Sequence, residues 1–349
     1  MKLDPKVVVW EYTLACNSNC IHCGSDAKVC RKNELSTTEA LDLVSQIKGV
    51  GFSRVILSGG EPTIRKDWTK IGKKIGEEGM QFGIISNALA WNLKTYDSLT
   101  YLNPFSIGFS VDGEEKLHDY LRGYSGSHKK VFDSIRELKR RNLVVCAITS
   151  VNKSNLEELT KIRNRLIVYG VDAWQLQVAS PMGRMAENLD LVLNERDYYR
   201  FGEFVAETRE RVGYMNVQGA DCMGYFGELG KRIHDKWEGC NAGIKGLGIE
   251  SNGNIKGCLS MQNPCAVEGN IRNNSLENIW LSETNFKYNR NFQVSELKDK
   301  CRGCSYGEKC KGGCQSQSLA FSHEFHNSPY CFLRYETEQK ENGKNKKRN

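Results

Sequence analysis

Residues 7–23 read VVVWEYTLACNSNCIHC, an apolar run followed at once by three cysteines. The run is rich in β-branched and aromatic residues, which predicts a buried strand with Cys16, Cys20 and Cys23 in the loop behind it. Thiolates at such short spacings bind zinc or an iron–sulfur cluster. A structural zinc site usually takes four protein ligands, whereas the next cysteine, Cys30, lies seven residues further on. Three cysteines on a four-iron cluster leave one iron open, and an open iron can bind another molecule and react with it.

Strand-like and helix-like segments alternate from residue 6 to about residue 215. One helical segment, residues 36–51, opens with a capping pattern of Ser36 or Thr37 and Glu39, and residues 127–142 carry apolar residues at helical spacing. Six strand–helix units predict parallel strands with right-handed crossovers, and so a partial (β/α)6 barrel. The predicted strands are residues 6–14, 54–59, 81–87, 106–113, 143–152 and 173–180.

Short polar motifs end or follow these strands. In barrel-type folds the chemistry gathers at the carboxyl ends of the strands. The motifs that accompany the second to the sixth strand are GGEP (59–62), SN (86–87), SVDG (110–113), SVN (150–152) and SPMGR (180–184). Their shared position at one mouth of the predicted barrel indicates a single site built from all of these loops.

The cysteine loop and GGEP together resemble the signature of the radical S-adenosylmethionine (SAM) enzymes, with Cys16-x3-Cys20-x2-Cys23 after the first strand. The resemblance covers about residues 6–215. It implies that the open iron of a [4Fe–4S] cluster binds the amino and carboxylate groups of SAM. It also implies that an electron from the cluster cleaves SAM to a 5′-deoxyadenosyl radical, which takes a hydrogen atom from the substrate. A zinc knuckle or a redox triad is the alternative for these cysteines.

The GGEP motif supplies four predicted SAM-binding residues. Gly59 and Gly60 let the backbone approach the ligand closely, because neither carries a Cβ. Glu61 is predicted to accept a hydrogen bond from the SAM ammonium group, which would be a charge-assisted bond. Pro62 stiffens the turn.

Five further residues are predicted SAM contacts. Ser86 and Asn87 are expected to bond the ribose hydroxyls, and Ser110 and Asp112 face the same mouth. Arg122, in HDYLRG, is expected to reach the SAM carboxylate. Each of the five also has an alternative as ordinary turn or surface chemistry, since Asp112-Gly113 is itself a good turn pair. The sequence assigns no catalytic acid or base.

A second cysteine array follows a change of texture after residue 215. ESNGNIKGC (250–258) predicts a hairpin with an Asn-Gly turn at 252–253, and the remainder is rich in Gly and Cys, which is typical of a small region held by metal. The array resembles the SPASM extension of some radical SAM enzymes over about residues 240–335, and a zinc ribbon is the alternative. Its seven cysteines are Cys240, Cys258, Cys301, Cys304, Cys310, Cys314 and Cys331.

This resemblance implies two auxiliary [4Fe–4S] clusters. The second would be held by Cys301, Cys304, Cys310 and Cys331. The first would be held by Cys240, Cys258 and Cys314, and the candidates for its fourth ligand are Cys222 and Cys265. If neither binds, an open iron could take a substrate thiolate. If either binds, the cluster would rather relay electrons.

The chain of 349 residues thus divides into a radical SAM core (1–215), a bridging segment (216–239), a SPASM domain (240–335) and a disordered basic tail (336–349). The net charge of +7 is spread without long basic runs outside the tail, so nucleic-acid binding is not expected. No membrane span or signal peptide is expected either. We therefore expect a cytoplasmic protein, where fourteen cysteines would stay reduced.

The resemblance to SPASM enzymes implies a small peptide substrate and a product with a crosslink, a thioether, an epimerised residue or an oxidised one. The first strand begins near residue 6, so a leader-binding domain is expected on a separate partner protein unless the barrel and SPASM surfaces bind the peptide alone. A flavodoxin or ferredoxin would supply electrons. Sulfatase-maturing relatives carry Asp where this chain has Leu259, which argues against that activity. The sequence also allows oxidation of a small molecule or tetrapyrrole, or a non-catalytic iron–sulfur or zinc module that binds a partner.

Overall fold

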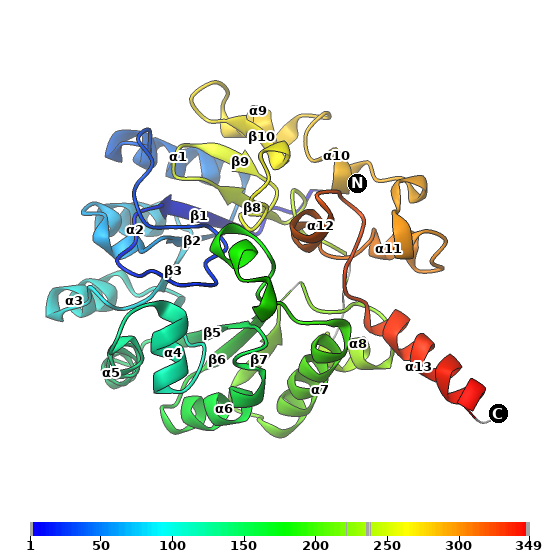
Figure 1. Cartoon of the computed structure of the whole chain (residues 1–349). Helices are drawn as coiled ribbons and strands as arrows, with labels where there is room; N and C mark the ends of the chain where they lie inside the picture. Colours follow the sequence, from blue (N-terminus) through cyan, green and yellow to red (C-terminus); the bar gives the residue numbers. More distant parts are fainter. Residues whose placement is uncertain (1–2, 221, 235–236, 238, 347–349) are drawn as a thin grey trace.

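Ten strands form one sheet, in the order β10-β9-β8-β1-β2-β3-β4-β5-β6-β7, in the computed structural model of the chain (Figure 1). The structure describes residues 3–220, 222–234, 237 and 239–346. All neighbours from β8 through β1 to β7 pair in parallel, and the β8–β9 and β9–β10 pairs are antiparallel. The strands are β1 Val7–Thr13, β2 Arg54–Gly59, β3 Gln81–Ser86, β4 Ser106–Ser110, β5 Val145–Val151, β6 Ala173–Val178, β7 Asn216–Gly219, β8 Gly246–Ile249, β9 Asn254–Lys256 and β10 Val267–Asn270.

The first six strands lie within the six predicted ranges, and the partial (β/α)6 barrel is confirmed. Both faces of these strands are largely covered, so their sequences are nearly continuous apolar runs. Trp10 of β1 and Trp174 of β6 are fully buried, and the indole of Trp174 donates to Thr149 Oγ1 at 2.8 Å. The predicted barrel therefore has an ordinary packed core, with the strand ends left to carry the polar groups.

Helices cover the outside of the parallel strands (Figure 1). The first has the predicted capping box: Ser36 accepts from the Glu39 N–H, and the Glu39 carboxylate accepts from the Ser36 N–H. The predicted segment 127–142 forms the fifth helix, with its apolar face buried. The helices are α1 Thr37–Val50, α2 Trp68–Glu77, α3 Leu93–Leu102, α4 Glu115–Arg122, α5 Ser127–Arg140, α6 Leu159–Val168, α7 Glu195–Arg211, α8 Glu228–Ile233, α9 Leu276–Leu281, α10 Lys287–Arg290, α11 Gly307–Cys310, α12 Gln315–Ser322 and α13 Phe332–Lys346.

The cysteine-rich region continues the barrel sheet. The predicted hairpin is present as β8 and β9, and Gly253 in its turn has a φ of 89°, which glycine adopts without strain. β8 also pairs in parallel with β1, from Val7 opposite Gly246 to Trp10 opposite Ile249. At the other end of the sheet, β7 falls in the segment predicted to bridge the domains and pairs with β6. The predicted boundaries therefore divide one continuous sheet.

The C-terminal segment differs from its prediction. Residues 336–346, expected to be disordered, belong to α13, and residues 347–349 lie outside the described part of the chain. Phe332 at the start of this helix is fully buried, and Tyr335 stacks on Tyr199 of α7 with ring centroids 4.6 Å apart. The Glu336 carboxylate accepts from the backbone N–H groups of Glu228 and Leu229 at 2.9 and 3.0 Å, and so caps α8. The prediction was wrong because it weighed charge composition and missed these anchoring contacts.

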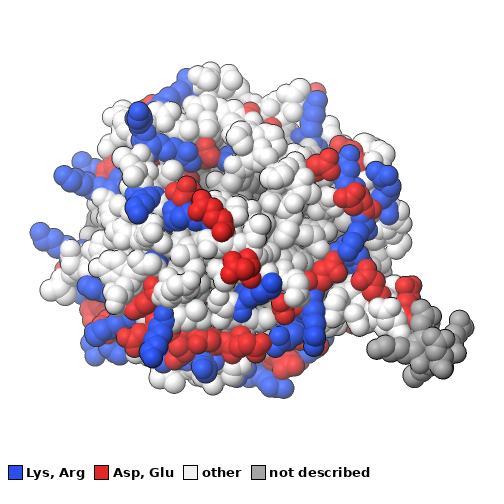
Figure 2. All heavy atoms as spheres, in the orientation of Figure 1, with Lys and Arg blue, Asp and Glu red and all other residues white. Residues whose placement is uncertain are grey.

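The surface carries charges of both signs. Lys and Arg side chains are interspersed with Asp and Glu across the face shown in Figure 2. None of the helices in the described residues is both long enough and apolar enough to cross a bilayer.

Candidate functional site: the barrel mouth and two cysteine groups

The loop after β1 presents three cysteines whose sulfurs each accept hydrogen bonds. Asn87 Nδ2 lies 3.6 Å from Cys16 Sγ, Arg122 Nη1 lies 3.7 Å from Cys20 Sγ, and the Ala27 N–H donates to Cys23 Sγ at 3.4 Å. Such donors stabilise thiolates. Burial raises the pKa of Cys16 to about 11, so its ionisation needs a nearby positive charge, which bound iron supplies. The donor set therefore fits an iron–sulfur cluster.

The two glycines of GGEP let β2 end directly against this loop. The Gly60 N–H donates to the Thr13 carbonyl and the Glu61 N–H to the Ala15 carbonyl, both at 2.8 Å. A Cβ on Gly60 would lie 2.6 Å from the Ala15 carbonyl carbon, and Gly59 has a φ of 118°. The two glycines thus allow a close approach to the backbone of the cysteine loop, and their approach to SAM stays a prediction. Pro62 is the first residue of the 3-10 helix Pro62–Ile64.

Glu61 organises the next strand end. Its side chain is fully buried and accepts from Ser86 Oγ and from the Asn87 N–H, both at 2.8 Å, as well as from the N–H and hydroxyl of Thr63. Burial raises the pKa of Glu61, and these donors oppose the rise. Oε2 accepts a single one of these bonds, so contact with SAM stays a prediction for Glu61, Ser86 and Asn87. The structure shows that this carboxylate orients Ser86 and Asn87, and that Asn87 Nδ2 lies beside Cys16 Sγ.

Asp112 joins the cysteine loop to the ends of β4 and β5. This fully buried carboxylate contacts the Arg122 guanidinium, lies 3.0 Å from His22 Nε2, and accepts from the Ser150 N–H at 2.8 Å. Burial opposes ionisation, but Arg122 and His22 outweigh it and hold the pKa of Asp112 below its ordinary value. Asp112 is thus a buried carboxylate that positions Arg122 beside Cys20, and direct SAM contact remains a prediction for both residues. Ser110, half-buried at the end of β4, remains a predicted contact too.

The loop after β6 contains two residues whose roles the sequence did not reveal. Arg184 donates through Nε to the Cys20 carbonyl oxygen at 2.8 Å, and its backbone N–H donates to the Cys23 carbonyl at 3.0 Å. Gly183 has a φ of 53°, and a Cβ there would lie 2.5 Å from the Cys23 carbonyl oxygen. The sequence places SPMGR at the end of the sixth strand. It does not show that this motif packs against the cysteine loop after the first strand.

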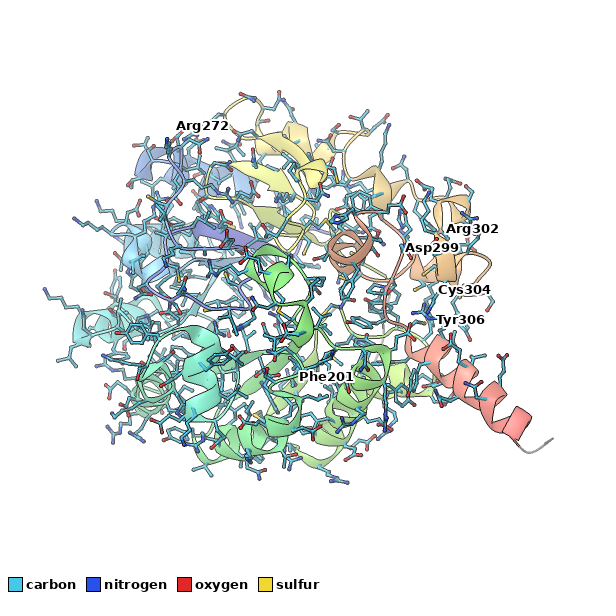
Figure 3. The ribbon with its side chains drawn as sticks, in the orientation of Figure 1. Phe201, Arg272, Asp299, Arg302, Cys304 and Tyr306 are labelled. Atoms are coloured by element: carbon cyan, nitrogen blue, oxygen red, sulfur yellow. The ribbon has the colours of Figure 1, made fainter. Side chains whose placement is uncertain are left out.

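Seven further cysteines are grouped in the way that the predicted ligand sets require, and their role as ligands stays a prediction. One group is centred on Cys310, whose neighbours are the thiols of Cys331, Cys301 and Cys304. Burial, together with these neighbours, raises the pKa of Cys310 to about 12. Cys304 lies at the outer edge of the molecule, on the segment that carries Asp299, Arg302 and Tyr306 (Figure 3).

The second group is centred on Cys314. The thiols of Cys240 and Cys258 are among its neighbours. Among the described residues, no three His, Cys, Asp or Glu side chains are arranged to hold a single metal ion. The cluster assignments of all these cysteines are therefore proposals that rest on spacing, grouping and hydrogen-bond donors.

A buried ionic network links the hairpin of the cysteine-rich region to β1. Lys256 contacts the Glu250 carboxylate and donates to the Met261 carbonyl at 2.8 Å. On the barrel side, Arg31 donates through Nε to Glu11 at 3.0 Å, and Ser251 Oγ donates to the same carboxylate at 2.9 Å. These contacts fix the loop carrying Cys258 relative to the loop carrying Cys16.

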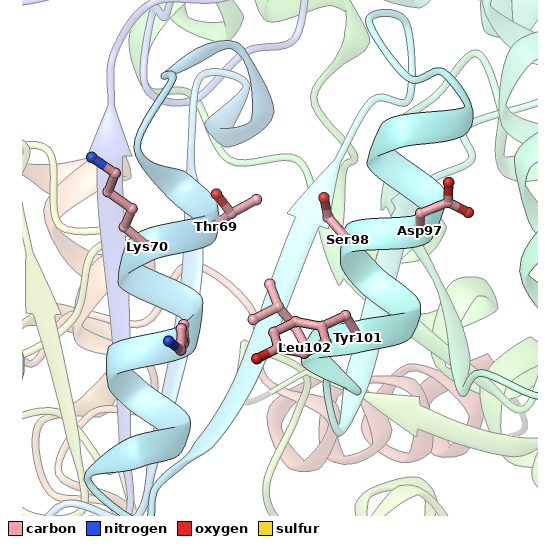
Figure 4. A pocket seen from close by; sticks show the side chains of 7 residues that line it. Thr69, Lys70, Asp97, Ser98, Tyr101 and Leu102 are labelled. Carbon is pink, nitrogen blue, oxygen red and sulfur yellow. The ribbon is translucent and has the colours of Figure 1, made fainter.

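A cleft of about 270 Å³ opens between the two cysteine-bearing parts. Met182 and Gly183 line it from the loop that packs on Cys23, and Ser260 lines it from the loop that follows Cys258. Its described lining is free of Lys, Arg, Asp and Glu and consists of Pro181, Met182, Gly183, Ala186, Ser260, Gln262, Asn263, Pro264, Ser316, Leu319, Ala320 and His323. A larger hollow of about 420 Å³ lies between α2 and α3, outside the barrel, and its lining holds no cysteine (Figure 4).

Comparison with known protein families identifies the family of this chain. Residues 10–166 match the family model of the radical SAM superfamily, and residues 240–305 match the SPASM model, described as an iron–sulfur cluster-binding domain. The chain belongs to the radical SAM proteins with a SPASM domain. Its cofactors are accordingly SAM and [4Fe–4S] clusters, since the radical SAM domain uses one to bind SAM and the SPASM domain binds auxiliary ones.

Relatives of this radical SAM/SPASM chain have two kinds of named activity. The chain is 28% identical to the AdoMet-dependent heme synthase of Methanosarcina barkeri, over 95% of this chain and 97% of that protein. It is 24% identical to the PqqA peptide cyclase of Bradyrhizobium diazoefficiens, over 94% and 86%. The fold is that of Streptococcus suis SuiB, whose structure with S-adenosylmethionine superposes with a TM-score of 0.76 at 19% identity, over 95% of this chain and 78% of that one. SuiB has also been crystallised with its precursor peptide, SuiA.

Proposed function

We propose that this radical SAM/SPASM enzyme abstracts hydrogen from a peptide and thereby installs a crosslink, a thioether, an epimerised residue or an oxidised one. The observation that carries the proposal is the polar lining of the cleft between the two domains, which in the described residues is free of Lys, Arg, Asp and Glu. Ser260, Gln262 and Asn263 offer hydroxyl and amide groups there. Such groups match the hydrogen-bonding needs of a peptide backbone.

When bound, the SAM cluster supplies the electron that cleaves SAM and generates the hydrogen-abstracting radical. The chain's own residues keep the cysteine ligands in position. Asn87 and Arg122 donate to the cysteine sulfurs, and the Asp112 carboxylate keeps the Arg122 guanidinium in place. Asp112 itself is sequestered from water, so this ion pair acts in a low-dielectric setting where its geometry is firmly kept. The cleft then brings substrate between Cys23 and Cys258.

The partners proposed with this activity are an electron donor and the peptide itself. A flavodoxin or ferredoxin would deliver electrons, and a separate leader-binding protein would present the peptide. A reducing cytoplasm is the expected setting, because the proposed ligand thiols must stay reduced. Sulfatase maturation is not favoured, since Leu259 occupies the position where an acid is expected and packs its backbone against Gly248.

A second candidate is oxidation of a tetrapyrrole side chain. The observation that favours it is the match to the heme synthase of Methanosarcina barkeri across 97% of that protein's length. A tetrapyrrole with several carboxylates would need cationic partners, because buried unpaired carboxylates are costly. The described lining of the cleft has no Lys or Arg, and its one basic side chain is the imidazole of His323. We therefore rank the peptide first.

One experiment separates the two. Holoenzyme reconstituted without oxygen would be given SAM, a reductant and either iron coproporphyrin III or synthetic peptides encoded by short reading frames beside the gene. We expect a peptide of changed mass or hydrogen content, with deuterium moving from labelled peptide into 5′-deoxyadenosine. A modified porphyrin together with unaltered peptides would overturn the proposal and establish the second candidate.

A further inference from the structure

Tyr288 belongs to a small apolar core that lies against two of the cysteines in the SPASM domain. Cys240 and Cys258 both pack against this core. Its members are Ala242, Met261, Ala266, Tyr288 and Leu319. The ring of Tyr288 also stacks on Phe325, with the ring centroids 4.3 Å apart and an angle of 2° between the ring planes. Packing on these neighbours fixes the direction in which the Tyr288 hydroxyl points.

The Tyr288 hydroxyl ends against the residue that precedes Cys258. A Cβ on Gly257 would lie 2.0 Å from Tyr288 Oη, which is far closer than two such atoms can approach. Only glycine therefore leaves room for the hydroxyl at this point of the chain. The close approach places the hydroxyl beside the backbone that carries Cys258.

The segment that carries Cys240 is held against the same place. The Gly243 N–H donates to the Gly257 carbonyl at 3.3 Å, which joins the two cysteine-bearing segments. Asn289, the residue after Tyr288 in α10, donates through Nδ2 to the Cys240 carbonyl at 2.7 Å and to the Ala242 carbonyl at 2.8 Å. Helix α10 and both segments therefore meet around Tyr288.

The Tyr288 hydroxyl has no hydrogen-bond partner among the described residues, although the side chain is only 8% exposed. Buried tyrosine hydroxyls normally have a partner. A phenol with a pKa near 10 is protonated at neutral pH and can donate its hydrogen. The sulfides and thiolates of an iron–sulfur cluster are acceptors, so a cluster bound beside Cys240 and Cys258 fits this unpaired donor.

We infer that the Tyr288 hydroxyl donates a hydrogen bond to a sulfur of the auxiliary cluster that Cys240, Cys258 and Cys314 are proposed to hold. Hydrogen bonds to the sulfurs are among the properties that set the reduction potential of such a cluster. Reduction adds negative charge, so the bond is stronger in the reduced state and raises the potential. Tyr288 thus tunes electron transfer through this cluster, whichever substrate the enzyme takes.

The test measures the reduction potentials of the clusters in anaerobically reconstituted holoenzyme, by redox titration followed with paramagnetic resonance. Tyr288→Phe keeps the ring and its stacking on Phe325 and removes the hydroxyl alone. We expect one auxiliary cluster to become about tenfold harder to reduce, which corresponds to about 59 mV for one electron, while the other clusters keep their potentials. Potentials that do not change, or that fall together in all clusters, would overturn the inference.

A second readout detects the hydrogen itself. Reduced wild-type enzyme exchanged into D₂O should show a deuteron coupled to the shifted cluster that Tyr288→Phe lacks. Tyr96→Phe is the matched control, because the Tyr96 hydroxyl bonds Ser134 Oγ at 2.9 Å between α3 and α5, and it should change neither readout. An identical deuteron coupling in Tyr288→Phe, or a zinc ion in place of the cluster, would refute the inference. Because neither readout uses a substrate, both stand apart from any failure of the proposed activity.

Discussion

The guanidinium of Arg184 donates through Nε to the carbonyl oxygen of Cys20 at 2.8 Å. The same side chain lies 2.6 Å from the Asp26 carboxylate and 3.2 Å from the Ala27 carbonyl. The backbone N–H of Arg184 also donates to the Cys23 carbonyl, so this residue binds the cysteine loop at several points. It does so although more than half of the domain separates the two in sequence. The geometry of the SAM cluster therefore depends on the loop after β6.

Replacing Arg184 with methionine should loosen the cysteine loop. Hydrogen bonds to charged groups contribute about 1.5–3 kcal/mol each, and the Cys20 and Ala27 carbonyls would lose their partner. We expect a lower thermal midpoint and a SAM-dependent paramagnetic signal reduced severalfold. Arg200→Met is the matched control, because Arg200 is half exposed and pairs with Glu157 at the surface. Equal behaviour of the two variants would contradict the role given to Arg184.

Gly60→Ala should be strongly destabilising. The new methyl group would meet the Ala15 carbonyl carbon at 2.6 Å, and backbone cannot yield as a side chain can. Overpacking of this kind costs about 1–3 kcal/mol and sometimes more. Gly49→Ala in α1, where nothing lies within 4 Å, should instead stabilise by about 0.5–1 kcal/mol. Circular dichroism during heating measures both, and a harmless Gly60→Ala would disprove the close packing.

Asp112→Asn would leave Arg122 buried without its counter-charge. Breaking a buried pair in this way costs about 3–5 kcal/mol. The double variant Asp112→Asn, Arg122→Met should recover part of that loss, because it removes the stranded charge as well. Chemical denaturation of the three proteins is the measurement, with Asp133→Asn at an exposed ion pair as the control. No recovery in the double variant would argue against a stranded arginine.

Arg272→Ala tests how the segment that follows β10 in the SPASM domain is attached to α1. Arg272, at the edge of the molecule in Figure 3, pairs with the Glu39 carboxylate at 2.5 Å and lowers its pKa to about 2, assisted by Ser36. The stabilisation is fully present above the unfolded pKa of about 4.3 and is lost only as pH falls towards 2. We therefore expect a loss of about 0.5–1 kcal/mol that is constant between pH 6 and 8 and shrinks with added salt. A loss that varies within that pH range would assign the effect to another group.

The metal content is the first quantity to measure. Three four-iron clusters predict about twelve irons and as many sulfides per chain after anaerobic reconstitution, with no zinc. About four irons with one or two zinc ions would preserve the SAM cluster and refute the auxiliary clusters. The preference for peptide substrates would weaken with them.

The six strands and the cysteine groups could be predicted because both are local patterns: apolar runs such as residues 54–59, and thiols a few positions apart. What the sequence hid depends on partners far along the chain. Arg184 is an ordinary surface-type residue until Cys20 lies beside it, and Lys256 is out of place in a buried strand until Glu250 pairs with it. The helix at 332–346 escaped prediction for the same reason, because Phe332 and Glu336 find their sites only in the folded protein.

The pairing of β1 with β8 sets an order for biosynthesis. Val7 finds its partner Gly246 only after about 240 further residues have been made, which takes roughly 10–50 s at about 5–20 residues per second. Until then the edge of β1 that pairs with β8 has no partner strand, and the loop with Cys16 follows directly from β1. Such non-local pairing also slows folding once the ribosome has finished. The nascent chain therefore waits with its first iron ligands exposed, and we expect the iron–sulfur assembly machinery to load this protein after synthesis rather than during it.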